Sequence, residues 1–418
     1  MLRLLAYFVA TTAFPAPIER IWLTHATNDP SKIVINWETD APSDSLVDFG
    51  LSEALIQRIS AADKVALHHI EIPLEKRDTL YHYRVRSGND VSSTHTFKSY
   101  PSKDLRIAIV GDWGYAPGKD VSAIIKDDVH LLLTVGDNVA SLHEKGKEGT
   151  KAFSALIDAN RDLFRRTPFM PILGNHDREI TGRGPKPPAH AVYDVEATAY
   201  RKFFALPDDE WKWHFDLPGF DLRLIALDLN HIQDFGTTWQ TCHAWQPDSP
   251  QFQWFAKTMA ASTSGFVLTL MNEKQTQMQG LTKGAWHEHF RQGSALITGF
   301  GYFADRAELS GSLPYFNTCL KGDGDLLQRP TIQVPRSRGQ LPPAHPHGRR
   351  SHDEAPVQKP SRRGARHDRD RETCSLTHVP HTRGMKSGLR CRIGKETHAH
   401  PQFHRLCRHP RPRGGFCA

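Results

Sequence analysis

Short apolar runs separated by turn residues fill the segment 18–100. The runs read IERIWLTHA, KIVINWET, LVDFG, HHIEIPL, LYHYRVRSG and STHTFKS, and they are rich in β-branched and aromatic residues. Runs of this length and spacing predict an all-β sandwich of about seven strands. We expect Trp37, Tyr81 and Tyr83 to lie in its core. This segment shows no cluster of chemically active residues of its own.

The pattern changes at Leu105, where continuous apolar runs begin to alternate with helix-like stretches. The apolar runs occupy 105–110, 131–135, 169–173, 222–228, 266–271 and 294–299, and the helix-like stretches occupy 121–126, 151–165, 251–261 and 284–292. Continuous apolar runs are typical of strands that are buried on both faces. The sequence therefore predicts a layered α/β domain after the β sandwich.

Three polar motifs follow the first three of these apolar runs. They are GDWG at 111–114, GDN at 136–138 and GNHD at 174–177. Because open α/β sheets gather their chemistry at the carboxyl ends of strands, we expect Asp112, Asp137 and Asn175 to lie close together. Their oxygens suit hard cations, and Asp137 would bridge two ions, a pair that can clamp a phosphoryl group. His176 would face the substrate, either as a proton donor to the leaving group or as a partner for the phosphate oxygens.

In this order, the motifs resemble the first three blocks of the calcineurin-like metallophosphoesterases. The β-rich segment, with KIVINWET, LVDFG and LYHYRV ahead of FKSYP, resembles the fibronectin-III-like domain that precedes the catalytic domain of purple acid phosphatases. WKWHFDLPGFDLRLIALD and QFQWFAKTMA are similar to that family's stretch between its third and fourth blocks. The resemblance covers 18–325. It implies a β-sandwich flanked by helices, two metal ions (Fe, Zn or Mn), and hydrolysis of phosphate monoesters by a metal-bound hydroxide.

The resemblance also implies roles for individual residues of the first three motifs. Asp112 would bind the first metal ion, Asp137 would bridge both ions, and Asn175 would bind the second. His176 would be the catalytic histidine beside the metal ligands. The family's tyrosine ligand should follow the bridging aspartate by three residues, and Ala140 stands there instead. Without that phenolate, a purple ferric site is not expected.

The second half of the family's ligand set does not transfer cleanly. Its fourth block supplies a histidine after the next strand, where this chain has Asn272 and Glu273, and its Gly-His-x-His block corresponds to 299–302. Asn272 and Tyr302 are the candidates to replace the lost histidines, with Glu273 and His231 as further candidates. Since imidazole suits Zn and Fe while carboxylate and amide oxygens suit Mg, Mn and Ca, such a site would bind ions more weakly and prefer harder ones.

Three other histidines have plainer interpretations. His231 follows an apolar run and could be a metal ligand, or it could be a histidine of a surface loop. His287 and His289 are spaced like a metal pair, but they fall in a predicted helix, where residues two apart point to different faces. We therefore expect both to lie on the helix surface.

Of the six cysteines, only Cys242 and Cys319 precede residue 328. The part of the chain before the basic tail could therefore contain at most one disulfide, between these two residues.

The formal net charge of +7 is concentrated in the last part of the chain. Residues 328–418 hold 20 Lys and Arg against 6 Asp and Glu, which leaves 33 against 40 in the rest. The body is therefore not the basic protein expected of a nucleic-acid binder. The tail shows no apolar run long enough for a core strand or helix. Three interpretations stay open: disorder, binding to nucleic acid or another anionic surface, or a shift of reading frame near Leu327.

The N-terminus resembles a weak secretory signal, with a basic start, a short apolar stretch and a small-residue exit. This predicts a secreted or periplasmic protein; the alternatives are an apolar N-terminal strand or a wrongly assigned start. No segment is long and apolar enough to span a bilayer.

These features divide the chain into a signal segment (1–16), a fibronectin-III-like domain (17–102), a metallophosphoesterase domain (103–327) and a basic tail (328–418). The predicted function is metal-dependent hydrolysis of a small phosphorylated substrate, as in acid phosphatases. Loss of the family's tyrosine and histidine ligands leaves one alternative, a catalytically impaired relative that binds a phosphorylated or glycosylated ligand.

Overall fold

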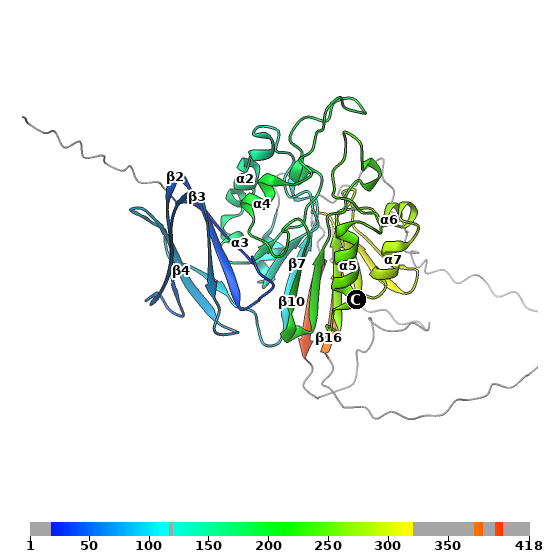
Figure 1. Cartoon of the computed structure of the whole chain (residues 1–418). Helices are drawn as coiled ribbons and strands as arrows, with labels where there is room; N and C mark the ends of the chain where they lie inside the picture. Colours follow the sequence, from blue (N-terminus) through cyan, green and yellow to red (C-terminus); the bar gives the residue numbers. More distant parts are fainter. Residues whose placement is uncertain (1–17, 117–119, 321–371, 379–388, 396–418) are drawn as a thin grey trace, which may run out of the picture.

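The computed structural model describes residues 18–116, 120–320, 372–378 and 389–395. A β-rich domain, coloured blue in Figure 1, precedes a larger domain in which helices flank two sheets. The predicted signal segment at 1–16 lies outside the described residues. None of the helices in the described part of the chain is long and apolar enough to cross a membrane.

The N-terminal domain is the predicted β sandwich. Its strands are β1 (Ile18–Thr24), β2 (Lys32–Gly50), β3 (Gln57–Pro73), β4 (Leu80–Ser87), β5 (Asp90–Val91) and β6 (His95–Lys98). β2 and β3 are long enough to belong to two sheets. The first half of β2 pairs with β1 and with the end of β3, whereas its second half pairs with the start of β3 and with β4. This arrangement confirms the predicted β sandwich. Trp37, Tyr81 and Tyr83 are each at most 2% exposed, as predicted for its core.

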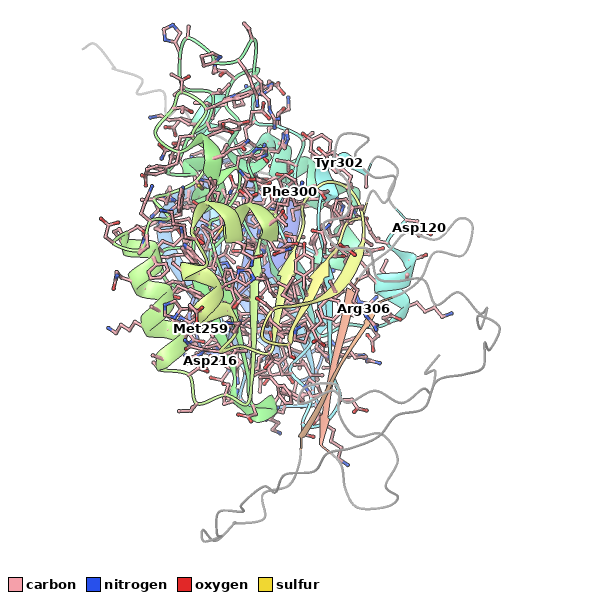
Figure 2. All side chains as sticks on the ribbon, turned by 90° about the vertical axis from the view of Figure 1, so that its right-hand side faces the viewer. Asp120, Asp216, Met259, Phe300, Tyr302 and Arg306 are labelled. Atoms are coloured by element: carbon pink, nitrogen blue, oxygen red, sulfur yellow. The ribbon has the colours of Figure 1, made fainter. Side chains whose placement is uncertain are left out.

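The α/β domain contains two sheets whose neighbouring strands are mostly parallel. The first holds β7 (Leu105–Val110), β8 (Leu131–Thr134) and β9 (Phe169–Met170) in parallel. The second has the order β10 (Trp213–Leu217), β11 (Leu222–Ala226), β12 (Phe266–Met271), β13 (Ala295–Thr298), β15 (Leu313–Asn317), β14 (Asp305–Leu309). Parallel pairing aligns the carboxyl ends of β7, β8 and β9 at one edge. Phe300 and Tyr302, in the loop after β13, lie at the upper end of the strands in Figure 2.

Successive residues of the second sheet face two different apolar cores. Leu224 and Ala226 pack into the core shared with β7 and β8, whereas Ile225 packs into the core shared with Phe255 and Trp286 of the covering helices. Burial on both faces explains why these strands are apolar throughout. The domain therefore has four layers, with helices outside both sheets (Figure 1).

Five of the seven helices in the described residues fall in the predicted stretches to within a few residues, whereas α4 and α6 were not predicted. They are α1 (Ser122–Lys126), α2 (Lys151–Ala159), α3 (Arg161–Phe164), α4 (Thr198–Phe203), α5 (Pro250–Ala260), α6 (Gln275–Leu281) and α7 (Ala285–Phe290). The prediction that His287 lies on the surface of its helix is wrong, because that ring is only 4% exposed and packs near Phe290. His289 is partly exposed.

Two segments of the basic tail form strands. β16 (Glu372–His378) and β17 (Leu389–Lys395) pair antiparallel with each other, and β17 pairs antiparallel with β7. No strand was predicted in the tail, because neither segment contains a long apolar run. A strand can join the open edge of a sheet through backbone hydrogen bonds, which do not require an apolar run. Other tail residues lie outside the described part.

Candidate functional site

The carboxyl ends of β7 and β8 bring Asp112 and Asp137 together. Their φ angles are 52° and 54°, in the left-handed region that aspartate tolerates better than most residues. The Asp112 N–H donates to the carbonyl of Gly136 (3.1 Å), and the Gly114 N–H donates to the carbonyl of Asp137 (2.8 Å). Burial, and then the charge of Asp137, raise the pKa of Asp112 well above its usual value. Oδ2 of Asp112 is buried without a hydrogen-bond partner, so a cation would relieve both conditions.

The loop after β9 packs directly against Asp137. A Cβ on Gly174 would lie 2.1 Å from Oδ1 of Asp137, so only glycine allows this approach. The same Oδ1 accepts a hydrogen bond from the His176 N–H (3.1 Å). Asn175 is 2% exposed, and its Nδ2 has no hydrogen-bond partner among the described residues. Because the two ends of an amide are distinguished only by their hydrogen bonds, Asn175 can present its oxygen here.

The last residues of two motifs fasten the loops to each other. The carboxylate of Asp177 accepts hydrogen bonds from the N–H of Asn138 (2.8 Å), the side-chain amide of Asn138 (2.9 Å) and the N–H of Gly174 (2.8 Å). Asn138 also donates to the carbonyl of Ile172 (2.9 Å). These two residues therefore maintain the spacing of the loops that carry Asp137 and Asn175.

His176 begins the short 3-10 helix η3 (His176–Arg178) and is 8% exposed. Its Nδ1 lies 2.8 Å from Oε2 of Glu179 and 2.8 Å from the carbonyl of Ala140. Arg183 and the hydroxyl of Tyr115 both contact Nε2. Burial lowers the pKa of His176, but the charges of Asp137 and Glu179 outweigh burial and the net shift is upward. The residue therefore suits the proton-donating role predicted for it.

Tyr115 supplies a phenol close to the position where the family's tyrosine is missing. It ends the 3-10 helix η1 (Trp113–Tyr115), and its hydroxyl lies 3.3 Å from the carbonyl of Ala140. Its ring centroid is 4.7 Å from that of His176 and 5.2 Å from that of Tyr302. A phenol thus reaches the site from the first motif instead of the second.

Asn272, predicted as a replacement ligand, is fastened to the backbone. Its Nδ2 donates to the carbonyls of Val135 (2.7 Å) and Gly299 (2.5 Å), and a Cβ on Gly136 would lie 2.5 Å from its side chain. Only Oδ1 is left to bind an ion. Tyr302 contacts Asp112 through its backbone N–H, which lowers the pKa of that carboxyl against the larger effect of burial.

The two further candidates have other roles. Both carboxylate oxygens of Glu273 accept backbone hydrogen bonds, from Ile232 (2.8 Å) and Lys274 (2.7 Å). His231 precedes the 3-10 helix η5 (Ile232–Asp234), with its ring 5.8 Å from that of Phe300. Burial and the charges of nearby Arg183 and His176 lower the pKa of His231 to about 4. It therefore lies near the site as a neutral ring.

The two body cysteines are free thiols, so a disulfide between Cys242 and Cys319 is excluded. Cys319 instead hydrogen-bonds to Asp112. The segment after β15 runs beside the first motif, where the Leu320 N–H donates to the carbonyl of Gly111 (2.8 Å), and this places the thiol at the site.

The donor set fits a hard cation better than a soft one. In the described ranges, no group of three or more His, Cys, Asp and Glu side chains is arranged to hold a metal ion. Asp112 and Asp137 are nevertheless adjacent, the first with an unpartnered buried oxygen, and Asn175 lies between two residues that contact Asp137, Gly174 and His176. Carboxylate and amide oxygens suit Mg, Mn or Ca. The structure brings Asp112, Asp137, Asn175, His176, Asn272 and Tyr302 to one edge of the sheets.

Four residues at the site were not predicted. Tyr115 directly follows the GDWG motif, Glu179 and Arg183 follow His176 by three and seven residues, and Cys319 follows β15. The spacing of Glu179 from His176 was the available signal, because residues three apart meet when a motif continues into a helical turn.

Comparison with known proteins supports this description. The calcineurin-like phosphoesterase family model matches residues 105–275. Purple acid phosphatase PPD1 from yellow lupin (Lupinus luteus) seeds has a TM-score of 0.56 and 14% identity, covering 77% of this chain and 68% of its own. PhoD has a TM-score of 0.54 and 11% identity, covering 72% of this chain and 76% of its own. Identities this low show a shared fold alone. No curated protein matches this sequence.

Proposed function

Because this chain carries a calcineurin-like metallophosphoesterase domain with the fold of the purple acid phosphatases, we propose that it hydrolyses small phosphate monoesters with bound metal ions. One observation carries the proposal: a buried carboxylate pair, Asp112 and Asp137, lies beside a histidine whose pKa is raised. A metal pair stabilises the attacking and leaving oxygens of a phosphoryl transfer and activates water.

Each residue of the site has a distinct task in this proposal. Asp112, Asp137 and Asn175 would hold the ions, with Oδ1 of Asn272 and the hydroxyl of Tyr302 as additional oxygen donors. Manganese is the best of the candidate metals (Fe, Zn and Mn), because it accepts carboxylate and amide oxygens readily. His176 would hold a proton on its ring and give it to the leaving-group oxygen as the P–O bond breaks.

One observation favours the alternative, a catalytically impaired relative that binds a phosphorylated or glycosylated ligand. The described residues lack a group of three His, Cys, Asp or Glu side chains that could hold a metal ion. Such a protein would keep the fold and the ligand binding and lose turnover.

Metal reconstitution separates the two functions. The protein is stripped with a chelator, supplied with Mn, Mg, Zn or Fe, and assayed for bound metal and for hydrolysis of p-nitrophenyl phosphate. We expect Mn to bind and to restore turnover, and the Asp137→Asn variant to lose both. The Asp162→Asn variant, with its carboxylate 72% exposed beside Arg165, is the matched control. Absence of bound metal and of turnover with every ion would overturn the enzymatic proposal and leave the alternative.

A further inference from the structure

A carboxylate and a guanidinium contact the two nitrogens of His176 from the loop that follows it. Oε2 of Glu179 lies 2.8 Å from Nδ1, and Arg183 contacts Nε2. Glu179 and Arg183 also pair with each other, with 2.9 Å between Oε1 and Nε. The Glu179 side chain is 4% exposed, whereas the Arg183 side chain is 35% exposed. The carboxylate is therefore fixed inside the fold, while the guanidinium can reach solvent.

These contacts set the surroundings of the two ring nitrogens of His176. Nδ1 faces two acceptors, Glu179 and the carbonyl of Ala140. The hydroxyl of Tyr115 contacts both nitrogens, and Arg183 lies closest to Nε2. Arginine can only donate hydrogen bonds, so with Arg183 in this position Nε2 faces a donor and is closed to a leaving group.

Arg183 is also suited to bind phosphate. Its planar fork matches two oxygens of a phosphate dianion, a geometry that lysine lacks. Its face lies 6.0 Å from the ring centroid of Tyr193, while Nε donates to Glu179 and Nη2 contacts His176. Two lysine side chains near the site loops in sequence also lie over aromatic rings. Lys186 lies over Trp239, and Lys274 lies over Phe300. A monoester dianion offers three terminal oxygens, whereas a diester offers two and a single charge.

We propose that Arg183 is the phosphate-binding residue of this site and that it leaves Nε2 of His176 when a monoester binds, while Glu179 keeps the imidazole in place through Nδ1. This movement opens Nε2 to the leaving-group oxygen, the atom on which His176 acts in the proposed function. Glu179 is a positioning residue, and Arg183 selects dianionic monoesters over diesters. This inference rests on the proposed function.

Phosphate binding tests Arg183 without any need for turnover. Titration calorimetry of inorganic phosphate into the Mn-loaded and the metal-free full chain gives the Kd. We expect the Arg183→Gln variant to weaken binding about 10- to 100-fold, as for loss of a charged hydrogen-bonding partner, and Arg183→Lys to recover only part of it. Arg201 lies on α4 and its guanidinium pairs with Glu210, away from the site loops, so the Arg201→Gln variant should bind phosphate like the wild type. An unchanged Kd in Arg183→Gln would overturn the proposal.

The dependence of kcat on the leaving group tests Glu179. An alkyl ester such as glycerol 2-phosphate needs a proton at its leaving oxygen far more than p-nitrophenyl phosphate does. We expect Glu179→Gln to lower kcat for the alkyl ester about 10- to 100-fold more than for the aryl ester, and Glu210→Gln to change neither. An equal loss of kcat for both esters would show that Glu179 has a merely structural role, and it would overturn the proposal that Glu179 positions His176. If the wild type hydrolyses neither ester, the proposed function fails, while phosphate binding still decides the role of Arg183.

Discussion

Asp112 and Asp137 place two carboxyl groups close together in a buried site. This arrangement favours the binding of a cation, and it lowers the stability of the folded protein when no cation is bound. Burial and the neighbouring charge both raise the pKa of Asp112. A carboxyl whose pKa is higher in the folded state destabilises that state at neutral pH, by about 1.4 kcal/mol for each pKa unit. The site therefore stores unfavourable electrostatic energy that a cation would release.

Replacing one of these charges should separate stability from metal binding. We expect the metal-free Asp112→Asn variant to unfold at a higher temperature than the metal-free wild type, by a few degrees. Addition of Mn should raise the melting temperature of the wild type but not of the variant. Thermal unfolding with and without chelator measures both effects. Asp162→Asn is the control, and a metal-free variant less stable than the wild type would contradict the argument.

The sequence predicted the residues that belong to motifs and missed those that depend on loop geometry. Asp112, Asp137 and His176 could be placed because each follows an apolar run, and strand ends meet at one edge. Arg183 and Cys319 could not, because their contacts depend on the path of a loop and on the segment that follows β15. The contact between the backbone carbonyl of Ala140 and His176 could not be predicted either, because it does not depend on the side chain at that position.

At the scale of elements, Asn272 joins the ends of three strands. It follows β12, and its amide donates to backbone carbonyls that follow β8 and β13. It therefore ties the first sheet to the second at the site edge.

Removing this amide should weaken the whole domain. The Asn272→Ala variant leaves the buried carbonyls of Val135 and Gly299 without that donor, at a cost of about 1–3 kcal/mol for each group left unsatisfied. We expect the urea midpoint to fall accordingly. Gln277→Ala, which removes an exposed amide contact with Gln233, should leave the midpoint unchanged. Equal midpoints for the wild type and Asn272→Ala would show that the contact carries no stability.

Most elements of the body could be predicted, because burial on two faces gives strands a continuous apolar run. The same reasoning missed α4, which lies among polar residues before β10, and α6, whose Gln-rich sequence lacks an apolar stripe. It also missed β16 and β17, whose pairing uses the backbone of β7. Composition alone does not reveal a strand of this kind.

At the scale of the whole molecule, the tail hairpin covers the edge strand that leads to Asp112. A chain that ends at residue 371 lacks β16 and β17 and exposes the backbone of β7. Exposed edge strands pair with other chains, so we expect this truncation to melt earlier and to form larger species in light scattering. A chain that ends at residue 395 keeps the hairpin and should behave like the full protein. Identical behaviour of the two truncations would show that the hairpin is dispensable.

Protonation of buried histidines should set the lower pH limit of the fold. His25 is 1% exposed; Nδ1 lies 2.7 Å from the carbonyl of Lys32 and Nε2 lies 2.9 Å from the hydroxyl of Tyr100. Its ring also packs 4.6 Å from that of Phe215 in β10, so it lies where the two domains meet. Burial lowers its pKa to about 4, and the pKa values of His68 and His130 are also lowered to about 4, mainly by burial.

The direction in which stability changes with pH follows from the pKa of these histidines in the unfolded chain, which is near 6.5. Above that pH, both states hold these rings neutral and stability is complete. As pH falls from 6.5 to 4, the unfolded state binds protons first, so stability is lost; His25 alone accounts for roughly 3 kcal/mol at pH 4. We expect the melting temperature to fall across this window and to fall less in His25→Gln, with His289→Gln as control. Equal pH slopes in all three proteins would contradict the argument. An acid optimum for hydrolysis would then have to lie above the pH at which His25 is protonated, since activity below it would decline with the folded fraction.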